Sequence, residues 1–330
     1  MKMLINTPDT LVSDALDGLA CAHPELIRVR RNPDYVIRAD APLRDRVAVV
    51  SGGGSGHEPM HIGYVGRGML TAACPGAIFT SPTPDQILAA THEAASDAGV
   101  LYIIKNYAGD RMNFEIAIEM ITAEGIPVAT VIVADDIAGP AAELRRGTGA
   151  TVIVEKIAGA AAEMGASLDE CARIAHHAAN QSRSIGVALS ACTVPSLARP
   201  SFHLDDHEIE IGIGIHGEAG WQRSTLAPVS QIIDRLCDNL RDDLNLRAGD
   251  RTLAFVNGLG ATTYLELYVA FNEVARWCTT HNITIERSLV GHYMTSLNMA
   301  GCTVTLTRLD DELLRLWDAP AWTPALRWGI

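Results

Sequence analysis

Residues 51–58 read Ser-Gly-Gly-Gly-Ser-Gly-His-Glu and directly follow the apolar run Val47–Val50. Glycine loses more conformational freedom on folding than any other residue, so this cluster costs stability that a functional contact would offset. Backbone N–H groups in such a segment can hold hydroxyl or carbonyl oxygens, and the adjacent His57 can move a proton. The segment lacks the lysine of a Walker phosphate loop and the last glycine of a dinucleotide fingerprint. A small oxygen-rich ligand is therefore the functional prediction, and a structural tight turn is the alternative.

Asp110 and His216 also have side chains suited to chemistry. Asp110 follows Lys105 after an apolar run. A carboxylate beside an imidazole can take a proton from a hydroxyl group, so Asp110 and His57 form a candidate catalytic pair. Capping the next helix is the ordinary role of such an aspartate, and both roles can coexist. His216 lies in Gly-Ile-His-Gly-Glu, where a neutral imidazole can attack a reactive carbonyl carbon or simply be a satisfied polar group.

The stretch His57-Glu-Pro-Met-His61 matches the HExxH pattern of zinc hydrolases. That pattern works when a helix places both histidines on one face, one turn apart. Here a glycine-rich segment leads in, Pro59 lies between the histidines, and no third ligand stands out. Zinc hydrolysis is therefore the weaker hypothesis, and no metal site is predicted.

The elements that position these residues alternate between strands and helices. Strands are predicted at residues 47–50, 99–104, 127–133 and 151–154. Helices are predicted at residues 85–98, 113–124 and 158–164. Near-continuous apolar strands separated by helices indicate a parallel sheet covered on both faces. Because ligands bind beyond the carboxyl ends of such strands, the polar segments that follow them are expected to meet at one edge.

A further helix is predicted from Asp169 to Ser184, and we place a domain boundary after it. The fold class is then α/β, with two lobes over residues 1–185 and 186–330, each a mainly parallel or mixed sheet covered by helices. The glycine-rich segment belongs to the first lobe and His216 to the second. In the second lobe, alternation predicts a half-buried strand over 208–216, and a second strand and a helix follow at 252–256 and from 263.

Composition excludes several classes of protein. The chain has 330 residues, 48% of them hydrophobic, and its 39 acidic and 26 basic residues give a formal net charge of −13. It has no Lys/Arg-rich block, so nucleic acid is not an expected partner. No apolar run approaches the ~20 residues of a membrane span. The N-terminus lacks the apolar core of a signal peptide, and the seven cysteines form no CxxC pair. We expect a cytoplasmic protein with reduced thiols.

Several of these stretches, in this order, resemble the substrate-binding K module of the dihydroxyacetone kinase family. The resemblance covers about residues 4–324 and is specific, because the motifs are long, unusual and ordered. The matching segments are SGGGSGHEP (51–59), AACPG (72–76), FTSPTPD (79–85), KNYAGDRMNFE (105–115), RRG (145–147), KIAGAAAE (156–163), GIGIHGEAG (212–220), VNGLG (256–260) and YMTSL (293–297).

The resemblance implies roles for particular residues. The histidine of Gly-Ile-His-Gly-Glu, here His216, forms a covalent hemiaminal with the ketone carbon of dihydroxyacetone in that family. The positions of His57 and Asp110 assist deprotonation of the hydroxyl that receives phosphate. The implied catalytic residues are His57, Asp110 and His216. The implied substrate-binding residues are Gly54, Ser55, Gly56, His57, Lys105, Asp110 and His216.

The resemblance also implies partners. The family's K module is usually a homodimer and presents its substrate to a separate L subunit, which carries ADP or ATP with Mg²⁺. No cofactor is expected in this chain itself. In phosphotransferase-linked systems a further subunit, M, rephosphorylates the bound ADP from phosphoenolpyruvate. We expect a phosphotransferase of that kind with an alcohol group as acceptor, although the sequence does not distinguish phosphoenolpyruvate from ATP as the ultimate donor.

Two alternatives stay open on the sequence. Some relatives act on four-carbon ketoses such as erythrulose, and departures from the family pattern at Thr71, Glu155 and His292 leave the choice of ketose open. Other K-like relatives bind dihydroxyacetone only to signal to a transcription factor. Retention of both His57 and Asp110 favours the enzyme, because a sensor has no need of a base.

Overall fold

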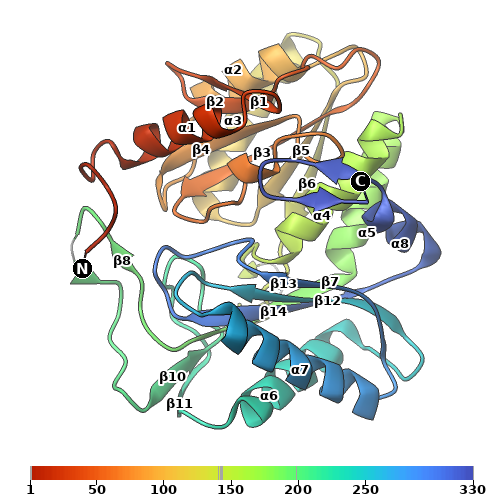
Figure 1. The fold of residues 1–330 in the computed structure, drawn as a ribbon. Helices are drawn as coiled ribbons and strands as arrows, with labels where there is room; N and C mark the ends of the chain where they lie inside the picture. The colour runs from red at the N-terminus through yellow and green to blue at the C-terminus, as the bar shows by residue number, and fades with distance from the viewer. Residues whose placement is uncertain (1, 140, 142–143, 198, 330) are drawn as a thin grey trace. The chain divides into compact units, whose positions relative to one another are not determined.

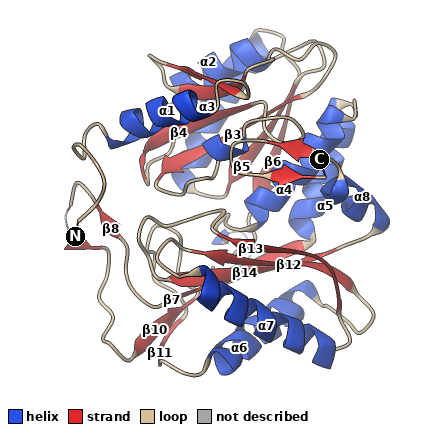
Figure 2. Ribbon diagram, in the orientation of Figure 1, coloured by secondary structure: helices blue, strands red, loops and turns tan. Residues whose placement is uncertain are grey.

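The structure is a computed structural model that describes residues 2–139, 141, 144–197 and 199–329. The chain forms two compact α/β units, whose elements are labelled in Figure 1 and coloured by type in Figure 2. Unit 1 comprises Met1–Val133, Thr151–Ala178 and Leu313–Ile330. Unit 2 comprises Ala134–Ala150 and Ala179–Glu312. The sequence predicts two contiguous lobes that meet after residue 185, whereas each observed unit is assembled from separate segments of the chain.

Unit 1 is built on a six-stranded sheet with the order β1-β2-β4-β3-β5-β6. Strands β4, β3, β5 and β6 are parallel, and β2 and β1 extend this sheet antiparallel beyond β4. The strands are β1 (Ile27–Arg30), β2 (Tyr35–Arg38), β3 (Ala48–Ser55), β4 (Ala72–Ile78), β5 (Val100–Lys105) and β6 (Val128–Val133). The parallel part agrees with the alternation of apolar strands and helices in the sequence.

Helices pack against this sheet and form the core of unit 1. On one face, Ile87 of α2 and Phe114 of α3 pack with Val50 and Tyr102. Side chains of a strand alternate between faces, so Ser51 and Lys105 point to the opposite face. The helices of unit 1 are α1 (Leu11–Ala22), η1 (Ile62–Tyr64), α2 (Pro84–Ala94), α3 (Ala108–Ala123), α4 (Ala150–Glu163), α5 (Leu168–Asn180) and α8 (Asp311–Asp318), and a short hairpin joins β15 (Ala321–Trp322) to β16 (Arg327–Trp328).

Unit 2 has a mixed sheet with the order β11-β10-β7-β14-β12-β13, in which only β12 and β13 are parallel. Its core lies between this sheet and α6 and α7, with Leu236, Val274 and Trp277 buried. The elements are β7 (Ser182–Ala188), β8 (Thr193–Val194), β9 (Arg199–Pro200), β10 (Glu208–Ile211), β11 (Gln222–Thr225), α6 (Val229–Leu244), β12 (Arg251–Gly258), α7 (Tyr264–Thr280), β13 (Thr284–Gly291) and β14 (Gly301–Arg308).

One predicted strand is part of a helix. Residues 151–154 form the first turn of α4, not a strand. These residues are buried on all sides, and a short run that is apolar all round reads equally well as a buried strand. Asp135 favours the helix, because its carboxylate accepts the backbone N–H groups of Thr148 and Ala150 at 2.7 and 2.9 Å.

Two other predicted elements are shorter than expected. The helix predicted to end at Ser184 ends at Asn180, and the following residues belong to β7. The strand predicted over 208–216 ends at Ile211. There the chain turns at Gly212, whose φ of +82° lies in the left-handed region that favours glycine. His216 therefore lies in a loop beyond the strand.

All seven cysteines are free, and Cys21 alone among them is exposed. In the described ranges of the chain, no helix combines the length and the apolar character needed to cross a lipid bilayer. The sequence-based expectation of unbridged thiols agrees with the first observation.

Two helical glycines provide a matched test of how closely α4 packs. A Cβ on Gly159 would lie 2.4 Å from the Cα of Met69, whereas a Cβ on Gly18 of α1 would meet nothing within 4 Å. Gly159→Ala should lower the free energy of unfolding by about 1–3 kcal/mol, the usual cost of overpacking. Gly18→Ala should raise it by about 0.5–1 kcal/mol, because alanine is the better helix former. Chemical denaturation measures both changes, and equal effects would contradict this packing of α4.

Candidate functional site

The polar segments after β3 and β5 lie at one edge of the sheet of unit 1. These strands are adjacent and parallel, with Val50 paired to Tyr102 and Ser51 to Ile103. Their carboxyl ends therefore leave the sheet on the same side, and this brings the end of the glycine-rich segment and residues 105–110 into one neighbourhood. The apolar runs that precede the two segments predict this arrangement.

The glycines of this segment belong to the strand itself, because β3 continues to Ser55. Two of them leave room for neighbouring groups. A Cβ on Gly53 would lie 2.0 Å from Nζ of Lys105, and a Cβ on Gly54 would lie 2.6 Å from the backbone nitrogen of Thr80. A side chain at either position would collide with these atoms. Residues 52–54 are thus not a tight turn, and their bare backbone is needed for the close approach of Lys105 and of the loop after β4.

Lys105 and Asp110 form a buried ion pair. Their Nζ and Oδ2 atoms are 3.3 Å apart, and the two residues are only 1% and 3% exposed. Asp110 lies in the first turn of α3, where the helix dipole favours a negative charge. The N-cap of α3 is Tyr107, so Asp110 does not have the capping role that the sequence offered as its ordinary function. The pair sets a cation beside a potential proton acceptor.

His57 is fully buried directly after β3, and its ring stacks on Phe79 with centroids 4.8 Å apart. The stretch from His57 to His61 consists of turns and leads into η1, so its histidines are not one helical turn apart. The geometry that the zinc pattern requires is therefore missing. Over the residues that the structure describes, no group of three or more His, Cys, Asp or Glu side chains is placed to hold a metal ion.

A second layer of buried polar side chains lies behind Lys105. Its Nζ is 3.0 Å from Nε2 of His61, and Nδ1 of His61 is 2.5 Å from Oε1 of Glu155 in α4. Ser51 also contacts Nδ1, at 3.1 Å. Burial raises the pKa of Glu155 to about 8, against the opposing charge of Lys105. Burial and the charges of Lys105 and His57 lower the pKa of His61.

In unit 2, Glu218 holds the side chain and the backbone of His216. Its Oε1 is 2.8 Å from Nδ1 of His216, and its Oε2 accepts the backbone N–H at 2.9 Å. Burial acts to raise the pKa of Glu218, but the hydrogen bond and charge of His216 outweigh it and lower the pKa to about 2. An ionised carboxylate can only accept hydrogen bonds, so whenever the ring of His216 is neutral it carries its proton on Nδ1 and its lone pair on Nε2. This is the form in which an imidazole attacks a carbonyl carbon.

Motifs that are far apart in the sequence support the loop of His216. Arg146, from the Arg-Arg-Gly motif, donates to the carbonyl oxygen of Gly212 at 2.8 Å. Ser296, from the Tyr-Met-Thr-Ser-Leu motif, donates to the carbonyl oxygen of Ile215 at 2.5 Å. The loop is therefore held at Gly212, where it leaves β10, and at Ile215, next to His216.

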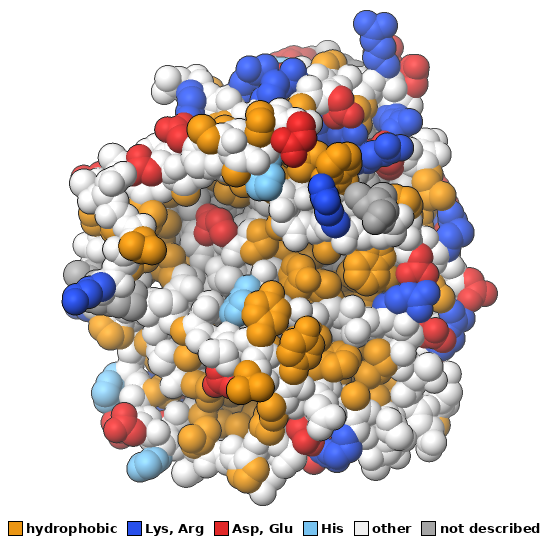
Figure 3. Space-filling view, viewed as in Figure 1, with side chains coloured by type: hydrophobic (Ala, Val, Ile, Leu, Met, Phe, Trp, Pro, Cys, Tyr) orange, Lys and Arg blue, Asp and Glu red, His pale blue; other side chains and the backbone are white. Residues whose placement is uncertain are grey.

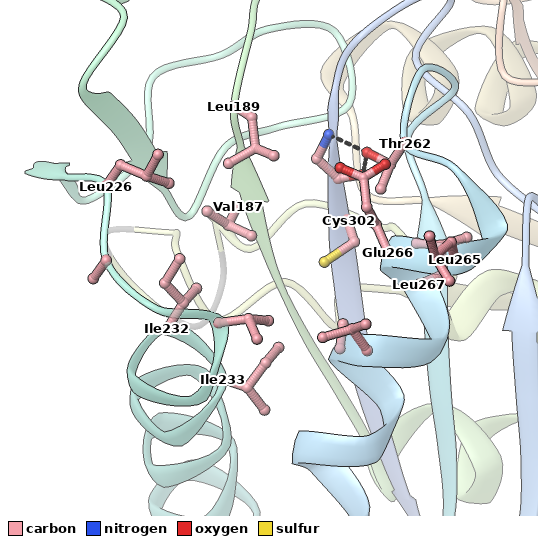
Figure 4. Close-up of a pocket in the computed structure, with 15 residues that line it drawn as sticks. Val187, Leu189, Leu226, Ile232, Ile233, Thr262, Leu265, Glu266, Leu267 and Cys302 are labelled. Carbon is pink, nitrogen blue, oxygen red and sulfur yellow. Dashed lines mark hydrogen bonds between the residues drawn. The ribbon is translucent and has the colours of Figure 1, made fainter.

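Unit 2 also contains an apolar cavity of about 300 Å³ between its sheet and helices α6 and α7 (Figure 4). Val187, Ile233 and Cys302 line it, together with Thr262, whose hydroxyl oxygen accepts the backbone N–H of Gly301 at 2.7 Å. None of the described residues in its lining is a predicted site residue. The carboxylate of Glu266 in the lining accepts hydrogen bonds from Thr263, and burial raises the pKa of Cys302 to about 12, so we do not include the cavity in the candidate site.

Charged side chains of both signs are mixed on the surface visible in Figure 3, as expected for a sequence without a Lys/Arg-rich block. On the face seen in Figure 3, Lys and Arg side chains of the described residues are interspersed with Asp and Glu. Exposed apolar side chains are also present, and on α7 they are Tyr264, Leu265, Tyr268 and Val269. Charge therefore marks no obvious ligand on that face, and the site rests on the buried groups.

Three residues of these arrangements are not among the sequence-predicted site residues: His61, Glu155 and Glu218. Glu218 had a signal, because it follows His216 closely in the glycine-flanked motif. His61 is marked in the sequence only as part of the zinc pattern. Glu155 is marked in the sequence only as a departure from the family pattern, and nothing local indicates its contact with His61, 94 residues away. Thr71, a departure from the family pattern, is buried and accepts the backbone N–H of Val49 inside the sheet.

Comparison with known proteins gives consistent results. A family model described as the Dak1 domain matches residues 17–325. The chain is 48% identical over 356 residues to the PEP-dependent dihydroxyacetone kinase, dihydroxyacetone-binding subunit DhaK, of Escherichia coli (strain K12), with 100% of each chain covered. Among solved structures, the dihydroxyacetone kinase from C. freundii in complex with AMP-PNP and Mg²⁺ has a TM-score of 0.90 at 35% identity, over 99% of this chain and 61% of that chain. The dihydroxyacetone kinase operon co-activator Dha-DhaQ has a TM-score of 0.90 at 34% identity, over 96% and 98%.

The tautomer of His216 is directly measurable. Long-range ¹H–¹⁵N correlation spectra of the neutral ring should show a protonated Nδ1 and an unprotonated Nε2, and His216→Ala identifies the signal. Glu218→Gln should shift the proton toward Nε2, because a neutral amide no longer selects a donor at Nδ1. Glu208→Gln, a change of the same kind in β10, should leave the signal as it is. An unchanged tautomer in Glu218→Gln would show that Glu218 does not set it.

Proposed function

The chain belongs to the Dak1 domain family, as a member of the dihydroxyacetone kinase K type, and from this premise we propose that it is the dihydroxyacetone-binding subunit of a dihydroxyacetone kinase. The observation that carries the proposal is the contact between Glu218 and His216, which leaves a lone pair on Nε2. Dihydroxyacetone offers such a nucleophile a ketone carbon. The similarity to the Escherichia coli subunit along the whole of both chains supports the same assignment.

In this proposal the substrate is held by a covalent bond. Nε2 of His216 adds to the ketone carbon as the C=O π bond breaks, and the proton that Nδ1 releases is returned through water to the former carbonyl oxygen. The product is a hemiaminal, and no water leaves. Glycerol has no carbonyl group and cannot form this bond. Selectivity therefore comes from bond formation, in a ligand too small to offer much buried area.

The groups at the edge of the sheet of unit 1 act on the oxygens of the ketose. Gly54, Ser55 and Gly56 supply backbone beside His57, and Lys105 supplies a cation. We assign to His57 and Asp110 the removal of the proton from the hydroxyl group that receives phosphate. The buried ion pair of Lys105 and Asp110 supports this role, because it places a proton acceptor beside a cation that can hold a substrate oxygen.

The phosphate donor belongs to a partner in this proposal. A separate L subunit carries ADP or ATP with Mg²⁺, which neutralises the charge of the phosphate groups, and in a phosphotransferase-linked system an M subunit reloads it from phosphoenolpyruvate. The Escherichia coli relative supports this division, because it is named a dihydroxyacetone-binding subunit and matches this chain over 100% of each. The substrate-binding chain itself acts as a homodimer in the cytoplasm.

A sensor of dihydroxyacetone is the second candidate, because the operon co-activator has the same TM-score of 0.90 as the kinase. A sensor needs a ketose-binding residue such as His216 but has no use for a base. The buried pair of Lys105 and Asp110 favours the enzyme, since burying two charges is costly and needs a reason in function or packing.

Mass spectrometry of the intact chain tests the covalent bond. After incubation with dihydroxyacetone, the mass should rise by one whole ketose, without loss of water, and peptide mapping should place it on His216. His216→Ala should remove the adduct and weaken the selection against glycerol. A borohydride-stable adduct would instead indicate a Schiff base on one of the chain's three lysines.

The same experiment with L-erythrulose and glycerol identifies the ketose. A stronger adduct with erythrulose would assign the chain to four-carbon ketoses. If no ketose gave an adduct, the covalent proposal would be wrong, and a noncovalent binding role would take its place.

Turnover in the presence of the L subunit and donor tests the base. Asp110→Asn should leave the adduct intact but lower kcat by roughly a hundredfold or more, as expected for loss of a general base. Asp85→Asn is a matched control, since Asp85 occupies the first turn of α2 as Asp110 does in α3. If Asp110→Asn kept its turnover, Asp110 would only balance the charge of Lys105. Adduct formation without any turnover in the wild type would favour the sensor.

A further inference from the structure

Four titratable side chains of unit 1 form one continuous buried chain: Asp110, Lys105, His61 and Glu155. Successive members are 3.3, 3.0 and 2.5 Å apart, and none is more than 4% exposed. They come from α3, the end of β5, the turn after β3, and α4. Lys105 lies over Gly53. The chain of contacts therefore connects the glycine-rich segment with the carboxyl group of Glu155, on the face of the sheet opposite α2 and α3.

Ser51 favours one tautomer of His61 in the first of two proton arrangements. Its hydroxyl group donates to the carbonyl oxygen of Ile103 at 2.7 Å, so toward Nδ1, 3.1 Å away, it can only accept. Nδ1 therefore carries the proton of the neutral ring and shares it with Glu155. Nε2 offers its lone pair to Lys105, which as an ammonium group donates to it.

The surrounding groups keep Glu155 near the point where it exchanges a proton. Burial raises the pKa of Glu155 to about 8, and the charge of Lys105 opposes a further rise. Burial and the charges of Lys105 and His57 lower the pKa of His61, so this ring stays neutral and does not hold a second proton. Among the described residues, Oε2 of Glu155 has no hydrogen-bond partner, which disfavours a permanently ionised carboxylate.

We propose that His61 and Glu155 are positioning residues that form a proton relay for Lys105. In one arrangement, the Lys105 ammonium donates to Nε2, and Nδ1–H donates to ionised Glu155. In the other arrangement, one proton has moved from Nζ to Nε2 and a second from Nδ1 to Oε1. This leaves a neutral amine, the other tautomer of His61 and a protonated Glu155. No proton is gained or lost, and the total charge does not change.

The relay lets the charge of Lys105 follow the charge of Asp110. While Asp110 is ionised, its distance of 3.3 Å favours the ammonium form of Lys105. Under the proposed function, on which this step rests, Asp110 accepts the proton of the substrate hydroxyl and becomes neutral. Lys105 then loses its counter-charge, and the arrangement of neutral groups is favoured in the buried site. The charge of Lys105 thus responds to catalysis without proton exchange with bulk water.

The relay can be observed directly, because the sequence contains only three lysines, Lys2, Lys105 and Lys156. Lysine labelled with ¹³C at Cε and ¹⁵N at Nζ gives one signal for each, and Lys105→Arg and Lys156→Arg assign them. In the isolated wild-type chain, the Lys105 signal should shift in a step near pH 8 that comes from Glu155.

Two variants should abolish that step. Glu155→Gln removes the group that titrates, and His61→Asn interrupts the relay while Glu155 stays in place. Glu163→Gln is the matched control, because Glu163 lies later in α4, pairs with Arg38 at 2.7 Å, and should leave the step unchanged. Thermal unfolding followed by circular dichroism establishes that each variant is folded, and either of the first two suffices for the test.

Turnover supplies a second readout. With the L subunit and donor, Glu155→Gln should lower kcat roughly ten- to hundredfold, the usual effect of removing a group that orients a functional one. It should also remove an inflection of the pH profile near pH 8 and leave the affinity for dihydroxyacetone unchanged, and Glu155→Asp should restore part of the rate.

An identical Lys105 titration in the wild type, Glu155→Gln and His61→Asn overturns the relay. The labelled-lysine measurement uses the isolated chain and no substrate. A chain that shows the coupled step but has no kinase activity therefore refutes the proposed function and leaves the relay standing, whereas active enzyme without the step refutes the relay alone.

Discussion

Lys105 is a buried ammonium group, and much of unit 1 follows from keeping its charge balanced. Moving a charged group from water into the protein interior costs on the order of several kcal/mol, even after the protein has relaxed around it. Nζ therefore needs partners around it. Asp110 supplies the opposite charge, His61 accepts a hydrogen bond, and Gly53 leaves the space that Nζ occupies. The first turn of α3, the turn after β3 and the bare backbone of β3 thus meet one electrostatic requirement. The glycines that first suggest ligand binding serve this requirement as well.

The two units use the same contact to opposite effect. In each, a carboxylate faces Nδ1 of a histidine, at 2.5 Å for Glu155 and 2.8 Å for Glu218. Glu218 has its pKa lowered to about 2 and is a fixed acceptor, whereas Glu155 has its pKa raised to about 8 by burial. A fixed acceptor suits a histidine that must keep a lone pair on Nε2. A titrating one suits a histidine that passes protons, and the environments separate the two roles.

The sequence predicts well those elements whose pattern and end signals agree. Strands β3, β5 and β6 coincide with apolar runs of the sequence. Helix α7 has Thr263 as its N-cap, in a capping box with Glu266. The prediction from sequence is wrong where a segment is buried on all sides and shows no hydrophobic periodicity. An example is the apolar first turn of α4, which the sequence predicts to be a strand. His57, Lys105 and Asp110 could be placed near one another because parallel neighbours share their carboxyl ends. The contact of His61 with Glu155 could not be predicted from the sequence, because only the tertiary fold brings α4 next to the face of the sheet that carries Lys105.

Unit 2 is nested in the chain between parts of unit 1, and this affects the order of assembly during synthesis. Lys156 of α4 donates to the carbonyl oxygens of Leu316 and Ala319, 160 and 163 residues later in the sequence. The ribosome therefore releases almost all of unit 2 before the last segment of unit 1 exists. Until then, α4 and the relay residues it carries lack part of their cover, so unit 2 can fold first, while unit 1 depends on the slow closure of long-range contacts.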